Sequence, residues 1–210
     1  MSDTRVLFAG TPEFALASLQ ALTDAGIVPL AVLTQPDRPA GRGKRLTASP
    51  VKQFALDQGI DVLQPATLKD PQVVAQIAAF EPDILVVAAY GLILPQSVLD
   101  IPSKGCLNVH ASLLPRWRGA SPIQAAILAG DEEAGVSLMA MTAGLDCGPV
   151  YIEEAVAIGA EETAGELHDR LAALGGELLV RHFDAIVSDA LDAVEQDDSR
   201  ATYAGKISKQ

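Results

Sequence analysis

The apolar run "ILVVAA", residues 84–89, constrains the fold of this chain more than any other stretch. A strand with one face in water alternates apolar and polar side chains, and this run shows no alternation. It is typical of a parallel strand that is covered by helices on both faces. Parallel strands are joined by crossover connections, which are usually helices. The run therefore predicts strands alternating with helices along the chain.

The surrounding sequence supplies these alternating elements. Further short, β-rich runs predict strands at residues 6–9, 29–34, 106–110 and 136–142. Residues 151–158 indicate another strand, antiparallel or at an edge of the sheet. The pattern predicts an α/β fold, a Rossmann-like and mostly parallel sheet with helices on both faces. Ligands bind such sheets at the carboxyl ends of the strands.

Helix boundaries are marked by repeated local signals. Four helices are predicted to start where a capping oxygen precedes a proline, whose missing N–H costs nothing at the first helical position. The capping residues are Thr11, Ser49, Asp70 and Ser121. Three glycines mark helix ends: Gly26, Gly59 and Gly130. A last long helix is predicted from Thr163, where Glu166 completes a capping box.

Composition limits the classes of protein that the chain can represent. A length of 210 residues suits one large domain, and a net charge of -12 disfavours a generally basic nucleic-acid binder. The two cysteines, Cys106 and Cys147, form no CxxC pair, so we expect no zinc site, no disulfide framework and a reducing, cytoplasmic setting. No stretch approaches the roughly 20 apolar residues of a membrane span. We expect a cytoplasmic protein without metal or membrane.

The turn after the first strand, "FAGTPEFA", is a candidate ligand site. It opens a helix, and the amides of a helix N-terminus favour anions and polar ligands. A tight βα turn with a well-capped helix is the alternative interpretation of the same residues. A dinucleotide cofactor is disfavoured because the turn holds one glycine rather than GxGxxG. The candidate residues are Gly10, Thr11, Pro12, Glu13 and Phe14.

Residues 36–52, "PDRPAGRGKRLTASPVK", form the most basic stretch of an acidic chain. The only acidic residue in it is Asp37. Basic side chains on an exposed, glycine-containing loop suit a phosphate backbone, which rewards positive charge without demanding fixed geometry. A solvated loop with incidental charge is the alternative interpretation. The basic residues are Arg38, Arg42, Lys44, Arg45 and Lys52.

The stretch "LNVHASLLPRWRGASPIQ", residues 107–124, carries the strongest chemical signal. Asn108 and His110 are two residues apart at the end of a predicted strand, so their side chains share one face. An amide donor and an imidazole at one point suit attack on a carbonyl, because the first stabilises an oxyanion and the second handles protons. Asp146, between Gly144 and Gly148, supplies a carboxylate to orient the imidazole, although an aspartate in a turn is common.

Two further features of the sequence bear on this chemistry. No serine or cysteine stands in a nucleophile elbow, so direct transfer between two bound substrates is the simplest reaction. The run "AAYGLILP", residues 88–95, could wall a pocket for a flat organic ligand or could be ordinary core. His168 and His182 lie in the last helix and have no comparable neighbours, so we expect them to be structural.

These stretches together resemble the formyltransferases that use 10-formyltetrahydrofolate. The similarity extends from "VLFAGTPEFA" through "PDRPAGRGKRL", "AAYGLILP", the central block and "GLDCGPV" to "TYAGKISK", and so covers nearly the whole chain. It implies transfer of a formyl group from 10-formyltetrahydrofolate to the amino group of initiator methionyl-tRNA. Transfer to an amino sugar or a ribonucleotide amine, or hydrolysis of the folate, are the alternatives. A monomer is expected.

The resemblance also implies roles for individual residues. Asn108, His110 and Asp146 form the catalytic trio, with Asp146 holding the imidazole. The turn at residues 10–14 and the basic loop, with Arg38, Arg42, Lys44 and Arg45, face the tRNA. The folate is lined by Leu92, Ile93, Leu94, Ser112, Leu113, Leu114 and Pro115.

One part of the family pattern lies outside the sequence. Family members usually continue into a C-terminal β-barrel domain that grips the tRNA. We therefore expect residues 1–189 to form the catalytic domain and residues 190–210 to be a linker or tail toward that second domain. The roles of Arg116, Trp117 and Arg118 stay open between a rim for the tRNA end and packing of the turn.

Overall fold

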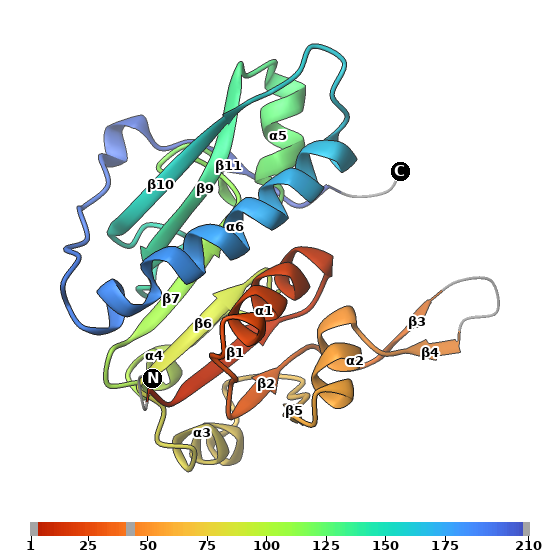
Figure 1. The fold of residues 1–210 in the computed structure, drawn as a ribbon, viewed down its shortest axis with the longest axis vertical. Coiled ribbons are helices and arrows are strands. Elements are labelled where there is room, and N and C mark those ends of the chain that lie inside the picture. Colours follow the sequence, from red (N-terminus) through yellow and green to blue (C-terminus); the bar gives the residue numbers. More distant parts are fainter. Residues whose placement is uncertain (1–3, 41–44, 208–210) are drawn as a thin grey trace.

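Seven strands form the central sheet of the computed structural model, which describes residues 4–40 and 45–207. Five strands are parallel and two, β9 and β10, continue the sheet antiparallel at one edge (Figure 1). The predicted mostly parallel sheet is confirmed. Across the sheet, the strands are β10 (Val150–Ala157), β9 (Glu133–Ala140), β7 (Cys106–His110), β6 (Ile84–Ala88), β1 (Val6–Gly10), β2 (Ala31–Leu33) and β5 (Asp61–Leu63).

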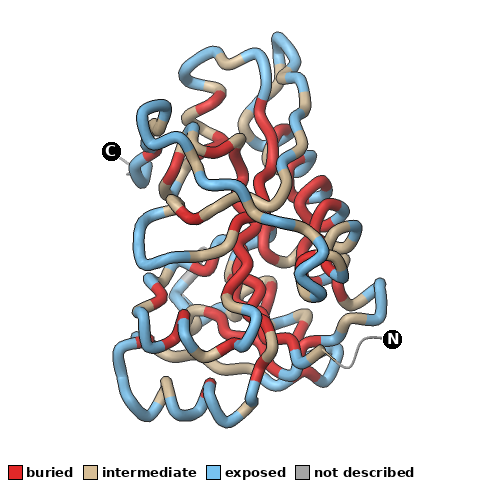
Figure 2. The backbone as a smooth tube through the Cα atoms, turned by 90° about the vertical axis from the view of Figure 1, so that its left-hand side faces the viewer, coloured by how far each residue is buried: buried red, intermediate tan, exposed pale blue. Residues whose placement is uncertain are grey.

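Helices cover both faces of this sheet, as expected. Alternate residues of β1 enter two separate hydrophobic clusters: Val6 and Phe8 pack on the side of α1 and α6, while Leu7 and Ala9 pack on the side of α3 and α4. The buried residues run along the centre of the chain trace in Figure 2. The helices are α1 (Glu13–Asp24), α2 (Pro50–Asp57), α3 (Pro71–Ala78), α4 (Gln96–Leu99), α5 (Pro122–Ala129) and α6 (Ala164–Val187). Within the described part of the chain, none of them has the length and apolar character to cross a membrane.

The order of the strands fixes where a ligand can bind. From β1 the chain first builds outward to β2 and β5, and then returns to the other side of β1 to build β6 and β7. The connections from β1 and β6 therefore diverge at the carboxyl ends of these strands. In open α/β sheets, a crevice for ligands lies at this switch point.

The strand predictions hold, apart from shifted boundaries and several short strands that were not predicted. The strand expected at residues 29–34 is limited to Ala31–Leu33. The strand expected at residues 136–142 begins earlier, at Glu133, and continues through Gly135. A side chain at Gly135 would lie 2.4 Å from both the Glu154 carbonyl oxygen and Leu113, so a glycine is required inside this strand. The strands that were not predicted are β5, β3 (Arg38–Ala40), β4 (Arg45–Thr47), β8 (Arg118–Gly119) and β11 (Tyr203–Ala204).

Most of the predicted helix signals also hold. Ser49 and Asp70 accept hydrogen bonds from helix amides, and Thr163 and Glu166 form the capping box. Gly26, Gly59 and Gly130 adopt the left-handed conformation beyond the ends of their helices. The prediction for Thr11 is wrong, because its hydroxyl donates to the carbonyl oxygen of Tyr90 and α1 starts at Glu13. Ser121 occupies the cap position of α5 without a side-chain hydrogen bond to the helix.

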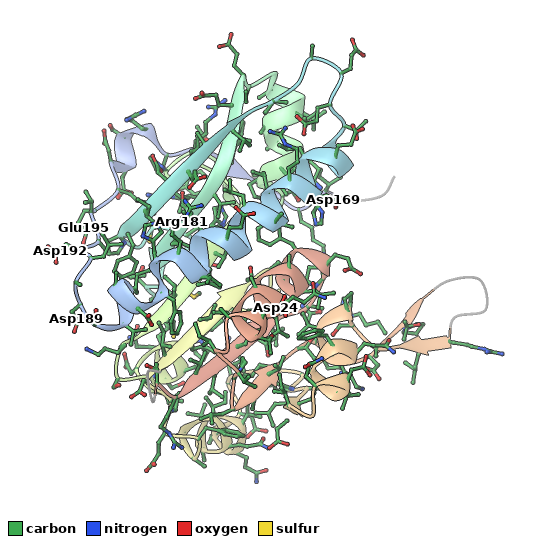
Figure 3. The ribbon with its side chains drawn as sticks, viewed as in Figure 1. Asp24, Asp169, Arg181, Asp189, Asp192 and Glu195 are labelled. Carbon is green, nitrogen blue, oxygen red and sulfur yellow. The ribbon has the colours of Figure 1, made fainter. Side chains whose placement is uncertain are left out.

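The residues after α6 lie against the body of the protein. Val194 forms an antiparallel bridge with Val150, β11 pairs in parallel with β8, and Ala204 is buried. The acidic side chains Asp189, Asp192 and Glu195 lie near one another at the start of this segment (Figure 3). Residues 194–204 are thus docked on the protein, and the role of residues 190–210 as a linker to a second domain stays a prediction.

Helices α1 and α6 pack so closely that Gly176 has no room for a side chain. An added Cβ would lie 2.9 Å from the Cβ of Ala21 and 3.0 Å from the Ala17 carbonyl oxygen. Gly176→Ala should therefore destabilise the fold by about 1–3 kcal/mol in urea unfolding, since the helices must separate. Gly165→Ala, in the first turn of α6, is the matched control. Its Cβ would have only one neighbour, at 3.8 Å, and we expect it to be neutral or stabilising. Equal stabilities of the two variants would contradict the close contact.

Candidate active site

The carboxyl end of β7 brings two polar side chains into one buried place. Asn108 and His110 are each 7% exposed and line the same cavity, as their spacing predicted. Between them, the side chain of Val109 packs into the large hydrophobic cluster. The strand thus fixes one face of the cavity with an amide and an imidazole.

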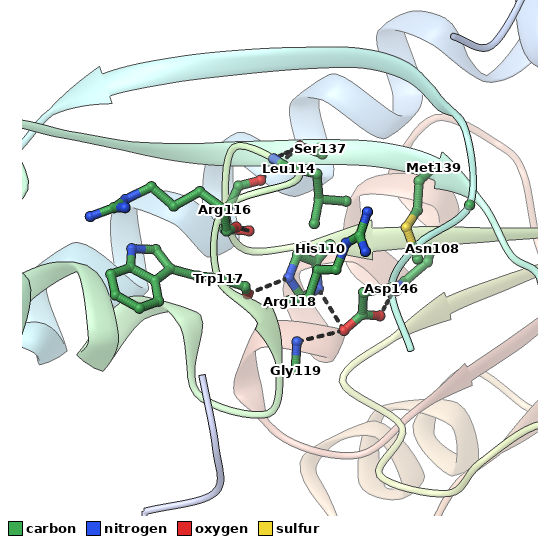
Figure 4. A network of polar contacts seen from close by, with 12 residues as sticks. Asn108, His110, Leu114, Arg116, Trp117, Arg118, Gly119, Ser137, Met139 and Asp146 are labelled. Atoms are coloured by element: carbon green, nitrogen blue, oxygen red, sulfur yellow. Dashed lines mark hydrogen bonds and ion pairs between the residues drawn. The ribbon is translucent and has the colours of Figure 1, made fainter. Parts of the chain in front are cut away.

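Asp146, in the loop after β9, completes this polar group (Figure 4). Its Oδ2 accepts a hydrogen bond from the Gly119 backbone N–H at 2.8 Å and lies 3.8 Å from Nδ1 of His110. Its Oδ1 accepts from Nδ2 of Asn108 at 3.4 Å. The structure therefore brings together all three residues that were predicted to form the trio.

A backbone carbonyl that the sequence did not indicate sets the orientation of His110. Nε2 of His110 lies 3.1 Å from the carbonyl oxygen of Trp117, and a carbonyl can only accept. Nε2 therefore carries a hydrogen, and Nδ1 is the ring nitrogen that faces Asp146. Trp117 has a φ of 59°, so a left-handed turn directs its carbonyl toward the imidazole.

A cavity of about 580 Å³ lies next to this group. Its walls are mostly apolar and include Leu92, Ile93 and Leu94, three of the residues expected to line the folate. Pro12 and Phe14 reach it from the turn before α1. His168 also lines the cavity, from α6, with its ring edge-on to Phe14 at 6.0 Å between ring centroids. The sequence provided no reason to expect His168 there, because the contact depends on how α6 crosses the sheet.

Other predicted site residues lie away from the cavity lining. Gly10 is enclosed by packing, since a Cβ there would lie 2.5 Å from that of Ala15. The hydroxyl of Ser112 donates to the Arg116 carbonyl, and the N–H of Leu114 donates to Ser137. Residues 112–115 thus build the turn after β7, and their contact with folate stays a prediction.

Packing of this turn accounts for Arg116, Trp117 and Arg118. Asp131 accepts hydrogen bonds from the guanidinium of Arg116 and from the indole N–H of Trp117, at 2.5–2.9 Å. Arg116 also stacks over the Trp117 ring at 4.4 Å. Arg118 is only 3% exposed and donates to Gln196 and Asp198. The three side chains fix the turn whose carbonyl orients His110.

The basic loop forms a hairpin that extends from the body of the protein (Figure 1). Its two strands are β3 and β4, and Arg38 and Arg45 on them are both exposed. Arg42 and Lys44 lie outside the described residues. Lys52 forms an ion pair with Asp37 at 2.7 Å, so its charge stabilises the base of the hairpin.

Cys106 is buried in β7 and donates a weak hydrogen bond to the Leu99 carbonyl. Burial raises the pKa of its thiol to about 12, which keeps it protonated near neutral pH. Cys106 is therefore part of the packed core. Within residues 4–40 and 45–207, we find no group of three or more His, Cys, Asp or Glu that could hold a metal ion.

The fold and this polar group place the chain in a known class. The formyl transferase family model matches residues 4–183, and the chain belongs to this family. A methionyl-tRNA formyltransferase of Stutzerimonas stutzeri (strain A1501) is 60% identical over 205 residues. That alignment covers 98% of the present chain and 65% of the relative, so the chain spans less than two thirds of the relative's length.

Solved structures show the same fold. A phosphoribosylglycinamide formyltransferase from Bacillus halodurans aligns with a TM-score of 0.74 at 25% identity, over 89% of this chain and 97% of its own. A sugar 3N-formyl transferase, crystallised in the presence of dTDP and 5-N-formyl-THF, aligns with a TM-score of 0.73 at 19% identity. That alignment covers 98% of this chain and 71% of the sugar enzyme, and it supports the fold alone.

The contacts of Asp131 predict a pH-dependent stability. Hydrogen bonds from Arg116 hold the pKa of Asp131 below its ordinary value. A lowered pKa in the folded state stabilises the protein above the unfolded pKa, near 3.9, and this contribution is lost as the pH falls further. Asp131→Asn should lower the free energy of unfolding by roughly 1 kcal/mol at pH 7, because Arg116 is half exposed.

The difference between the wild type and this variant should shrink below about pH 4, where the Asp131 carboxyl of the unfolded chain takes up a proton before that of the folded protein does. Urea unfolding between pH 7 and pH 3 measures it. Asp192→Asn, at an exposed aspartate, is the control and should change stability little. A difference that stays constant down to pH 3 would show that the ionised carboxylate does not contribute.

Proposed function

We propose that this protein transfers the formyl group of 10-formyltetrahydrofolate to the α-amino group of initiator methionyl-tRNA. The observation that carries this proposal is the convergence of Asn108, His110 and Asp146 at one end of a largely apolar cavity. The high identity to a methionyl-tRNA formyltransferase supports the choice of acceptor. We further propose that the protein acts as a monomer in the cytoplasm, where charged tRNA is used.

The three side chains can support the chemistry of formyl transfer. A new bond forms between the methionyl amino nitrogen and the formyl carbon, and the bond from that carbon to N10 breaks. The Asn108 amide has two N–H donors, so one can bind the developing oxyanion while the other remains near Asp146. Protonated His110 donates its Nδ1 proton to N10 of the folate. The methionyl amine loses a proton as the new bond forms, and this proton replaces the one that His110 has given up. Asp146 stabilises the imidazolium by its negative charge.

The cavity fits the folate in size and character. About 580 Å³ lies within the range of small-molecule sites, and a flat heterocycle prefers apolar walls with a few polar groups. We propose that Leu92, Ile93 and Leu94 contact its ring system. Ile93 is 86% exposed in the structure, so binding of a ligand would remove a large apolar surface from water.

The distribution of charge supports an RNA acceptor. The hairpin follows β2, whose carboxyl end lies at the same edge of the sheet as the cavity. Its arginines, Arg38 and Arg45, therefore lie on the side from which an acceptor reaches the trio. The acidic residues Asp189, Asp192 and Glu195 lie at the opposite side in Figure 3. We propose that the acceptor end of the tRNA approaches along the hairpin.

Removal of either polar group on β7 should abolish most of the activity while the fold persists. Asn108→Ala and His110→Ala should each lower kcat for methionyl-tRNA by about 10²–10³-fold, the usual effect of losing an oxyanion donor or an acid–base group. Steady-state formylation assays measure this effect. His182→Ala, at a half-buried histidine of α6, is the control and should keep near-normal turnover.

The same assays separate the alternatives. Full activity of either variant would contradict the assigned chemistry. Formylation of an amino sugar or a ribonucleotide amine, without activity on methionyl-tRNA, would replace the proposed acceptor. If formate is released at the same rate with and without an amine acceptor, the protein is a hydrolase of the folate.

The hairpin arginines should contribute affinity by binding phosphates. Arg38→Ala combined with Arg45→Ala should raise KM for methionyl-tRNA and leave KM for the folate unchanged. The dependence of log KM on log salt should flatten by about one unit for each arginine–phosphate pair that the substitutions remove. Arg181→Ala, at an exposed arginine of α6, is the charge-matched control for one substitution. An unchanged salt dependence would show that the hairpin does not bind the tRNA.

A further inference from the structure

The segment after α6 contacts both loops that hold the polar group of the site. Residues 194–204, which we name the clasp, lie outside the part of the chain that the family model matches. One contacted loop follows β9 and carries Asp146. The other follows β7 and carries the Trp117 carbonyl and the Gly119 N–H. The clasp therefore joins, from outside the cavity, the loop that carries Asp146 and the loop whose backbone contacts His110 and Asp146.

Gln196 is the contact between the clasp and the Asp146 loop. Its Nε2 donates to the carbonyl oxygen of Asp146 at 3.0 Å and to that of Gly148 at 2.6 Å. Asp146 has a φ of 48°, a left-handed conformation that is costly for a residue with a side chain. A conformation of this kind persists only where surrounding contacts hold it. The two hydrogen bonds from Gln196 act directly on this backbone.

The same side chain joins the loop to a buried arginine. Oε1 of Gln196 accepts from Nε and Nη2 of Arg118 at 3.1 and 2.8 Å. Arg118 also donates to Asp198 at 2.6 Å. An amide is the side chain that can accept from a guanidinium and donate to carbonyls at once. Gln196 therefore couples the positions of the two loops.

Backbone contacts of the clasp hold the second loop. The hydroxyl oxygen of Thr202 accepts from the Trp117 N–H at 2.9 Å, and its carbonyl oxygen accepts from the Arg118 N–H at 2.9 Å. β11 then pairs with β8, where Ala204 lies opposite Gly119. The groups that contact His110 and Asp146, the Trp117 carbonyl and the Gly119 N–H, thus lie in backbone that the clasp fixes.

We propose that Gln196 is a positioning residue for Asp146, and that through this one side chain the clasp holds the Asp146 loop although it touches neither substrate. This inference rests on the proposed function. Without the N–H groups that Gln196 donates to the two carbonyls, the Asp146 loop can move, and the distance between Asp146 and His110 increases. Because Gln196 acts on the position of Asp146 and does not itself line the cavity, the effect falls mainly on kcat.

Two substitutions separate the two ends of the Gln196 amide. Gln196→Ala removes both the donor and the acceptor, and should lower kcat by about 10–100-fold with KM values changed less than about twofold. Gln196→Glu keeps oxygen acceptors for Arg118 but loses the donor to the two carbonyls. We expect Gln196→Glu to lose kcat as Gln196→Ala does. Full activity of Gln196→Glu would show that only the pairing with Arg118 matters, and the proposal would be wrong.

A double-mutant cycle tests whether the effect passes through Asp146. Gln196→Ala should lower kcat in the wild type but cause little further loss in an Asp146→Ala background. Equal losses in both backgrounds would overturn the proposal. Ser199→Ala is the control and should keep normal kcat, since the hydroxyl of this clasp residue donates to Asp197 within the clasp itself.

A readout without catalysis keeps this inference separate from the proposed function. The Gly119 N–H donates to Asp146, so its hydrogen exchange reports how firmly the carboxylate is held. Exchange should be about tenfold faster in Gln196→Ala and unchanged in Ser199→Ala. If exchange is faster in Gln196→Ala but the wild type formylates no methionyl-tRNA, the proposed function is wrong and the role of Gln196 stands. Unchanged exchange of the Gly119 N–H in Gln196→Ala would contradict the positioning role of Gln196, whatever the formylation activity.

Discussion

The carboxylate of Asp146 connects β7 and the turn after it to a loop that is distant from both in sequence. It accepts from Asn108 on β7 and from the backbone N–H of Gly119 in the following turn, and it faces His110 at ion-pair distance. A charged group in so enclosed a place needs such partners, because loss of water is otherwise unfavourable. The sheet supplies a rigid position for Asn108 and His110, whereas Asp146 depends on loops. The geometry of the site is therefore set by whatever holds these loops.

The sequence predicted the sheet and the trio because both follow from local patterns. Uninterrupted apolar strands identify a parallel sheet, and a spacing of two on a strand places Asn108 and His110 on one face. Gly144 and Gly148 marked the loop that carries Asp146. Each of these signals lies within a few residues of the feature that it predicts. The capping pairs at Ser49, Asp70 and Thr163 were predicted for the same reason.

The features that sequence reasoning missed depend on contacts between distant segments. Thr11 has the spacing of a helix cap, but the Tyr90 carbonyl binds its hydroxyl. His168 reaches the cavity only because α6 packs across α1, where Gly176 allows the close approach. The polar residues after Asp189 indicated a tail, yet Gln196 donates to two backbone carbonyls and accepts from a buried arginine. Polar residues can be buried where their hydrogen bonds are met, and composition does not reveal those partners.

The nature of the clasp contacts has a consequence for the site. Apart from buried Ala204, the clasp is held mainly by hydrogen bonds and a two-residue strand pair, while Val194 and Tyr203 stay exposed. Segments with little apolar burial open at a lower free energy than the core. Opening of the clasp removes the partners of Arg118, and a buried guanidinium without partners is strongly unfavourable. Arg118 therefore favours the docked position of the clasp. One buried charge thus connects the clasp to the carboxylate that faces His110.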